Sequence, residues 1–288
     1  MAAPAVSADT PRDRASGRTF VALWLGVSII ATPFVAVFLG PAIPPGNGSA
    51  EAQAQVFDNQ VLVSVCTPIC AFVLLFIAYA AVSFRSRTAA LVDGAPVRGN
   101  MRLQVLWMVV TGVTVLTLAS FGSYELVKDG AGGGQGPSAA FVSASDKAHA
   151  LDVQVIGQQW EFTYRYPSAG GLETPHLVLP ANTVVRLHVT SLDAIHSFWA
   201  YQLGVKADAN PGSDNIVYVT TRKPLTFDVR CAELCGLWHG YMSDTGEVVS
   251  QTAFASWLAQ EKKTFAPILK YLPPYATSYV PDPQLRAG

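Results

Sequence analysis

The 288-residue sequence has few charged residues and no concentration of positive charge. Charged residues make up 14% of the chain, hydrophobic residues make up 50%, and the formal net charge is −1. Binding of nucleic acid requires a concentrated basic face, so the composition argues against a nucleic-acid partner. Cysteine and methionine are also rare, with four of each. The low charge and the mean hydropathy of +0.30 indicate a membrane protein.

Charge is missing from three long stretches in the first half of the chain. The gaps between charged residues hold 32, 26 and 22 residues, and all three lie before Glu125. A membrane helix needs roughly 20 consecutive apolar residues. We therefore predict a membrane region over residues 20–127, with transmembrane helices at about 20–40, 61–84 and 104–124.

Arginines are distributed unevenly around these helices. They precede the first helix and lie between the second and the third, whereas residues 41–60 contain no Lys or Arg. The positive-inside rule then places residues 1–19 in the cytoplasm of a bacterial-type inner or plasma membrane, and the chain after the third helix on the periplasmic or extracellular side. The alternative is that the first run is a signal peptide, cleaved at the small residues 49–54. Either outcome leaves the C-terminal part outside.

The pattern changes after the third helix. Residues 128–148 are rich in Gly, Ser and Ala, which predicts a flexible linker. Short alternating runs of β-branched and aromatic residues follow, separated by turn residues, and they predict strands at 151–155, 160–166, 176–180, 183–189, 215–220, 225–230 and 246–250. We expect an all-β Greek-key sandwich or barrel over residues 149–263, with a closing helix at about 252–262 and a C-terminal tail, 264–288.

The rare sulfur-bearing residues gather in one stretch, CAELCGLWHGYM at 231–242. A second loop, 191–200, carries a histidine, and loops from different strands of a Greek key meet at one end of the sandwich. The candidate metal ligands are therefore His196, Cys231, Cys235, His239 and Met242. Thiolates, imidazoles and a thioether suit copper, with methionine as the weak ligand. A zinc site of two cysteines and two histidines, or a disulfide between the two cysteines in an oxidising compartment, stays open as an alternative.

The spacing C-x-E-x-C-x-x-x-H-x-x-M, with DAIHSFW upstream, closely resembles the dinuclear copper (CuA) motif of cytochrome c oxidase subunit II. The segments RLQVLWMVV, GQQWEFTYRYP and LGVKADANPG are also similar to that family, and the likeness covers roughly residues 58–255. The resemblance implies a cupredoxin-like fold for the β domain. It implies bridging thiolates, one histidine on each copper and two weak ligands, carried respectively by Cys231 and Cys235, by His196 and His239, and by Met242 and the Glu233 carbonyl.

The same resemblance implies a role in electron transfer. Such a subunit accepts electrons from cytochrome c through Trp160 and passes them to haem in catalytic subunit I, where dioxygen is reduced to water. It performs no bond chemistry and has no catalytic residue of its own. The implied partners are subunit I, further oxidase subunits, cytochrome c and membrane lipid. The carboxylate of Glu233 is a candidate ligand for Mg²⁺ at the subunit I interface, and Asp193 is either a docking carboxylate or a turn cap.

Two features depart from the family pattern. The family normally has two membrane helices, and this chain has a predicted third helix in front of them. Many members also carry a glutamate near the start of the second family helix, at the mouth of a proton channel, where this chain has Gln104. These departures keep the copper subunit of a nitric oxide reductase as an alternative. A membrane-tethered copper-binding or delivery protein is the alternative from another class, although such a protein needs only a tether.

Overall fold

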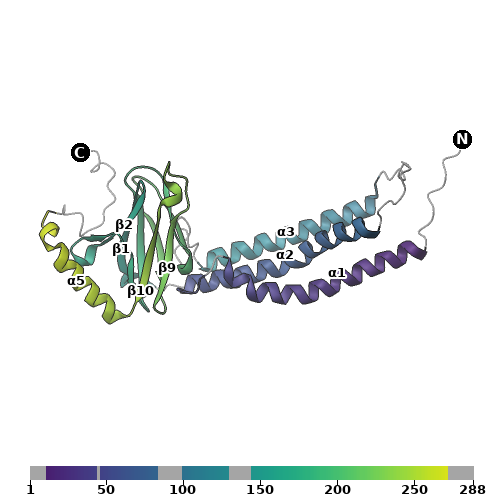
Figure 1. Ribbon diagram of the computed structural model, residues 1–288, viewed down its shortest axis with the longest axis horizontal. Coiled ribbons are helices and arrows are strands. Elements are labelled where there is room, and N and C mark those ends of the chain that lie inside the picture. Colours follow the sequence, from purple (N-terminus) through teal and green to yellow (C-terminus); the bar gives the residue numbers. More distant parts are fainter. Residues whose placement is uncertain (1–10, 44–45, 84–98, 130–143, 272–288) are drawn as a thin grey trace. The chain divides into compact units, whose positions relative to one another are not determined.

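The computed structural model describes residues 11–43, 46–83, 99–129 and 144–271 (Figure 1). The chain divides into two compact units. The first consists of the helical regions up to residue 41 and between residues 58 and 121, and the second of residues 42–57 together with the chain from residue 122 onward. The first unit is the membrane anchor, and the second contains the β domain.

Three long helices make up most of the membrane anchor: α1 (Pro11–Phe38), α2 (Ala50–Ser83) and α3 (Met101–Asp129). Their apolar spans have mean hydropathies of 2.2, 2.7 and 1.9, and each is long enough to cross a bilayer. The three predicted membrane helices are thus confirmed. All three begin earlier in the sequence than predicted, because polar residues continue the helix beyond the uncharged run. In α2, for example, Ser49 caps the first turn by accepting a hydrogen bond from the Ala52 N–H at 2.9 Å.

Helices α1 and α2 pack against each other in opposite directions. The indole N–H of Trp24 donates to the Pro68 carbonyl at 2.8 Å, and the rings of Phe20 and Phe72 meet edge to face with their centroids 5.4 Å apart. Nearer the other end of the pair, the Tyr79 hydroxyl donates to the Ser16 carbonyl at 3.1 Å. Low numbers in α1 therefore meet high numbers in α2, which makes the two helices an antiparallel hairpin with an aromatic contact surface.

The β domain is a sandwich of two five-stranded sheets. The first sheet has the order β3 (Leu172–Thr174), β2 (Glu161–Tyr166), β1 (Leu151–Gln158), β5 (Val184–Ser191), β8 (Asn215–Thr220). The second has the order β4 (Val178–Pro180), β10 (Ser243–Val249), β9 (Leu225–Cys231), β6 (His196–Ala200), β7 (Val205–Ala209). Most neighbours are antiparallel, but β1 runs parallel to β5 and β4 runs parallel to β10. This all-β sandwich behind a helical anchor confirms the predicted fold class.

Alternation along the strands creates the core between the sheets. In β2 the even-numbered residues Phe162, Tyr164 and Tyr166 are buried, whereas Glu161 is exposed. Phe162 meets Phe198 of the facing sheet edge to face, with ring centroids 5.7 Å apart. Burial of one such side chain contributes roughly 1.5–3 kcal/mol, so these aromatic residues hold the two sheets together.

The structure has three strands that the sequence pattern did not indicate, namely β3, β6 and β7. The prediction of a loop over residues 191–200 is wrong in its second half, because only residues 192–195 separate β5 from β6 and His196 begins β6. Nearly every residue of β6 is buried, so the alternation that reveals a half-exposed strand is missing there.

The ends of the β domain also differ from the expected boundaries. A short helix, α4 (Ala144–Ala148), lies at the end of the predicted linker, and α5 (Gln251–Leu269) continues past the expected end at residue 262. The Ser250 side chain caps α5 by accepting from the Ala253 N–H. Linker residues 130–143, most of the tail and the first ten residues lie outside the described part of the chain.

The segment before α2 is built into the β domain. The Gly48 N–H donates to the Gln202 carbonyl at 2.9 Å, and the Ser49 hydroxyl donates to the Leu203 carbonyl at 2.6 Å. The Glu51 carboxylate accepts from the Thr220 N–H at 2.9 Å and is only 5% exposed. Part of the small-residue stretch at 49–54 is therefore a buried structural element of this domain.

Candidate metal centre

Six strand ends, those of β1, β2, β5, β6, β9 and β10, and the three connections between them meet at one end of the sandwich. Strands β1 and β5 run parallel with Gly157 opposite Ser191, so they end side by side. Phe198 pairs with Cys231, which places the start of β6 beside the end of β9. The turn 159–160, the loop 192–195 and the loop 232–242 connect these ends, so the two predicted ligand loops lie next to each other.

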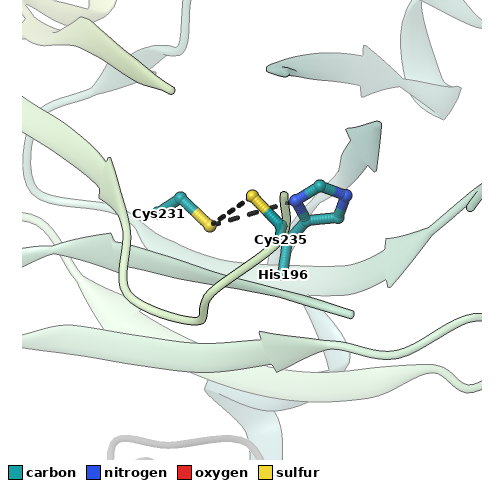
Figure 2. A group of neighbouring side chains, drawn as sticks. All are labelled: His196, Cys231 and Cys235. Atoms are coloured by element: carbon teal, nitrogen blue, oxygen red, sulfur yellow. Dashed lines mark hydrogen bonds between the residues drawn. The ribbon is translucent and has the colours of Figure 1, made fainter. Parts of the chain in front are cut away.

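Three of the candidate ligands form a buried cluster (Figure 2). The Cys231 Sγ lies 3.7 Å from the Cys235 Sγ and 3.9 Å from the His196 Nδ1. The ligand atoms of all three residues lie within 4.8 Å of one another. Both cysteines are free thiols, and their separation far exceeds the roughly 2.05 Å of a disulfide. The structure therefore argues against the disulfide alternative.

The remaining candidate ligands lie around the same two sulfurs. The Cys235 Sγ is 3.6 Å from the His239 Nδ1 and 3.8 Å from the Met242 Sδ, and the Cys231 thiol donates to the Glu233 carbonyl at 3.2 Å. Each sulfur thus has one imidazole and one further donor beside it: Cys231 has His196 and the Glu233 carbonyl, and Cys235 has His239 and Met242.

Local backbone structure brings the members of the loop 232–242 together. The Cys231 N–H donates to the Met242 carbonyl at 3.0 Å, which closes the base of the loop between β9 and β10. The Ala232 N–H donates to the Ser197 carbonyl at 2.8 Å and ties the loop to β6. A single 3-10 turn, His239–Tyr241, then directs the chain back toward the sulfurs. The spacing of the cysteines, the histidine and the methionine in residues 231–242 therefore suits a hairpin loop that turns back toward the ends of β9 and β10.

The chemistry of the donors favours copper. Burial, together with the hydrogen bond to Cys231, raises the pKa of the Cys235 thiol to about 12, so a metal ion must displace its proton to bind. A tetrahedral zinc site needs only the two cysteines and the two histidines. It would leave unexplained the Met242 sulfur, which is 2% exposed and faces the Cys235 sulfur. A soft thioether beside thiolates and imidazoles is the ligand set of electron-transfer copper.

Asp193 and Trp160 both contact groups of this site. The Asp193 Oδ1 accepts a hydrogen bond from the His196 Nε2 at 2.9 Å, and its Oδ2 accepts from the Gln159 N–H at 2.8 Å. Burial opposes ionisation of Asp193, but hydrogen bonds from these groups and from the Ala194 N–H outweigh it and lower the pKa of the carboxyl group. The partly buried Trp160 donates its indole N–H to the Cys235 carbonyl at 3.3 Å. The Asp193 carboxylate therefore accepts hydrogen bonds from groups of its own domain.

Two neighbouring residues of the site escaped the sequence reasoning. Gln159 donates its side-chain amide to the Cys235 carbonyl at 2.8 Å. Gly157 lies against His196, because a Cβ at position 157 would stand 3.1 Å from the Cδ2 of that ring. The only sequence signal for either residue is its place beside Trp160 in GQQWEFTYRYP.

The fold and the site define a membrane-anchored β-sandwich protein with a cluster of soft metal donors where its two ligand loops meet. A family model described as "Cytochrome C oxidase subunit II, periplasmic domain" matches residues 171–249, and one described as "Cytochrome C oxidase subunit II, transmembrane domain" matches residues 40–126. Together they match more than half of the chain, so this chain belongs to the cytochrome c oxidase subunit II family. It is a subunit of a haem-copper oxidoreductase complex. Helix α1 lies outside both matches.

Curated relatives extend the similarity over most of the chain. A probable cytochrome c oxidase subunit 2 of Rickettsia conorii is 27% identical over 242 residues, which are 77% of this chain and 71% of the relative. The cytochrome c oxidase subunit 2 of Synechocystis is 27% identical over 274 residues, or 84% of this chain and 79% of the relative. A crystal structure of the periplasmic domain of subunit II of the Bradyrhizobium japonicum cytochrome oxidase is 35% identical, with a TM-score of 0.39. The match covers 40% of this chain and 95% of the chain in that crystal structure.

Proposed function

We propose that this chain is the electron-input subunit of a haem-copper terminal oxidase. It accepts electrons from cytochrome c at a dinuclear copper (CuA) centre and passes them to haem in the catalytic subunit, where dioxygen is reduced to water. The observation that carries the proposal is the pairing at the two sulfurs. Cys231 and Cys235 lie 3.7 Å apart, and each has its own imidazole and its own additional donor.

The described residues suggest how each ligand would act. The thiolates of Cys231 and Cys235 and the imidazoles of His196 and His239 would hold the metal. The weak ligands would be the Met242 sulfur and the Glu233 carbonyl. When bound, a copper pair of this kind supplies a one-electron carrier whose charge is shared between two metals.

The β domain would hold the ligand side chains in fixed positions and exclude water from the metal site. His196 is 0% exposed and Met242 is 2% exposed. The hydrogen bond from the His196 ring to Asp193 fixes the tautomer that leaves the Nδ1 free to face the sulfur. A rigid, dry ligand set changes little between oxidation states, which favours fast electron transfer.

Exposed apolar side chains on the ligand loop support a site for protein partners. Leu234, Leu237 and Tyr241 are 78%, 83% and 77% exposed, and exposed apolar residues gathered on one loop are typical of an interaction surface. We propose that cytochrome c delivers electrons at Trp160 and that the haem-bearing subunit lies on the His239 side of the loop. The exposed carboxylate of Glu233 remains available for a Mg²⁺ ion at that interface.

The arginine distribution supports a cytoplasmic N-terminus and a periplasmic or extracellular copper domain. The three membrane helices would contact lipid and the further subunits of the oxidase. This orientation brings the copper site to the side of the membrane where soluble or tethered cytochrome c is found.

The test uses the complex purified intact in mild detergent. Optical and EPR spectra are recorded, followed by oxygen and nitric oxide consumption with reduced cytochrome c. We expect the mixed-valence signal of two equivalent coppers together with oxygen uptake. Cys231→Ser should abolish that signal, whereas Cys66→Ser, at an exposed position of α2, should leave it unchanged. Uptake of nitric oxide alone would move the chain to the reductase alternative, and a complex without copper would refute the proposal.

A further inference from the structure

The turn between β1 and β2 contacts two loops of the proposed copper site: the loop 192–195, which directly precedes His196, and the loop 232–242, which contains Cys235. It consists of Gln159 and Trp160, which follow the last residue of β1. One hydrogen bond from this turn leads to the 192–195 loop and two lead to the 232–242 loop. A two-residue turn that makes three hydrogen bonds to two other loops ties their positions together.

On the first side, the main chain of Gln159 reaches a ligand through Asp193. The Gln159 N–H donates to one carboxylate oxygen at 2.8 Å, and the other oxygen accepts from the His196 Nε2 at 2.9 Å. The two oxygens of one carboxylate therefore bridge the turn and the imidazole. His196 cannot rotate away from the sulfurs without breaking this bridge or moving the turn.

On the second side, the side chain of Gln159 reaches the other loop directly. Its amide donates to the Cys235 carbonyl at 2.8 Å, and the indole N–H of Trp160 donates to the same oxygen at 3.3 Å. Gly236 permits this close approach, because its φ is +119° and a Cβ there would lie 3.0 Å from the Gln159 amide nitrogen. The carbonyl oxygen of Cys235, a proposed copper ligand, thus accepts two hydrogen bonds from one turn.

We propose that Gln159 is a positioning residue of the copper centre, which holds His196, at the start of β6, and Cys235, in the loop 232–242, at a constant separation. Its N–H acts on His196 through Asp193, and its side-chain amide acts on Cys235. This inference rests on the copper site proposed above and assigns a role to a residue outside the ligand set. The residue is exposed, so no requirement of core packing explains why a side chain able to donate a hydrogen bond stands at this position.

The neighbouring Gln158 offers a matched control. It has the same side chain one position earlier, and its amide donates to the Glu161 carboxylate at 2.8 Å, away from both ligand loops. Gln158 is half-buried and lies outside the hydrophobic core cluster, and substitution of a polar residue at such a position usually has little effect. A difference between the two glutamines therefore reports the contact to Cys235 and not a general sensitivity of this turn.

The test compares Gln159→Leu and Gln158→Leu in the full-length chain within the purified oxidase complex. Copper content is followed against a competing chelator, and the EPR hyperfine pattern and the midpoint potential of the copper centre are recorded. Loss of such an outer hydrogen bond typically lowers metal affinity about 10–100-fold. For Gln159→Leu we expect about tenfold weaker copper retention, with an altered hyperfine pattern and a shifted potential. Gln158→Leu should match the wild type.

A second pair keeps the test valid if Gln159→Leu fails to assemble. Gln159→Glu keeps the length of the side chain and the main-chain N–H but replaces the donating amide with an acceptor, and Gln158→Glu adds the same charge next to it. We expect only Gln159→Glu to alter the copper signature.

Unchanged copper retention, hyperfine pattern and potential in both Gln159 variants would overturn the inference, even if the KM for cytochrome c rose. A rise in KM alone would place the residue in the docking surface. Wild-type complex without copper would overturn the proposed function as well, so the two failures are distinguishable.

Discussion

Gly157→Ala tests whether the close approach of β1 to His196 holds that imidazole in place. A Cβ at this position would lie 3.1, 3.3 and 3.4 Å from the Cδ2, Cγ and Cβ atoms of His196. Carbon atoms in ordinary contact are about 3.5–4.0 Å apart. The His196 ring must therefore move by several tenths of an ångström, although it is fully buried and its Nε2 donates a hydrogen bond to Asp193.

The magnitude follows from two opposing effects. Forcing a methyl group into a packed interior costs about 1–3 kcal/mol, whereas replacing glycine by alanine restricts the unfolded chain and gains about 0.4–1 kcal/mol. From the middle of each range, the net destabilisation of the β domain should be about 1.3 kcal/mol. At about 2–4 °C per kcal/mol, its unfolding temperature should fall by about 3–5 °C. The same displacement should change the EPR hyperfine pattern of the copper centre.

The control for Gly157→Ala is Gly240→Ala, in the loop next to His239. A Cβ at position 240 would meet nothing within 4 Å, and the backbone there does not require positive φ. This variant should keep the wild-type EPR spectrum and should be as stable as the wild type or more stable by up to about 1 kcal/mol, because only the restriction of the unfolded chain acts there. If Gly157→Ala unfolded at the wild-type temperature and had an unchanged EPR spectrum, the prediction would be wrong, because the added methyl group would then not displace His196.

Three further substitutions address other parts of the chain. Glu51→Ala leaves the N–H of the half-buried Thr220 without its carboxylate acceptor, which should destabilise the β domain by about 1 kcal/mol in thermal unfolding followed by circular dichroism. In Asp152, burial opposes ionisation, but the hydrogen bonds from Arg186 outweigh it and lower the carboxyl pKa. The pair therefore stabilises the fold above the unfolded value of about 3.9 and loses this effect as pH falls through the lower folded value. The side chain is 36% exposed, so Asp152→Asn should cost less than about 1 kcal/mol at pH 7 and nothing in strong acid, as a pH series of unfolding curves can show. Trp160→Phe keeps an aromatic ring but loses the indole N–H and its hydrogen bond to the Cys235 carbonyl. Stopped-flow reduction by cytochrome c should be slower at unchanged copper content, and an unchanged rate would contradict the proposed electron path.

Pattern reasoning succeeded where the signal is local. The uncharged runs predict three membrane helices because every segment that crosses a bilayer must be apolar along its own length. The strands with clear alternation, such as β2 and β9, each have one face in the core and one toward solvent. Strand β6 lacks this alternation because both of its faces are buried. The sequence pattern therefore predicts a loop at His196, where the structure has the start of a strand.

The sequence by itself determined the identities and the order of the proposed ligands. Four of the ligand side chains, those of Cys231, Cys235, His239 and Met242, lie within twelve residues, so their spacing alone indicates a soft-metal loop. One hairpin brings them together, and the contact from Cys235 to Met242 spans only seven positions.

Only the tertiary structure decided which distant residues support that loop. His196 and Cys231 are 35 positions apart, Gln159 and Cys235 are 76 apart, and Glu51 and Thr220 are 169 apart. Such contacts depend on how the strands are ordered and registered in two sheets, and no local pattern encodes the order of strands that pair across long connections. The proposed ligands could therefore be predicted from the sequence, whereas the hydrogen bonds that hold these side chains in place depend on the folded domain.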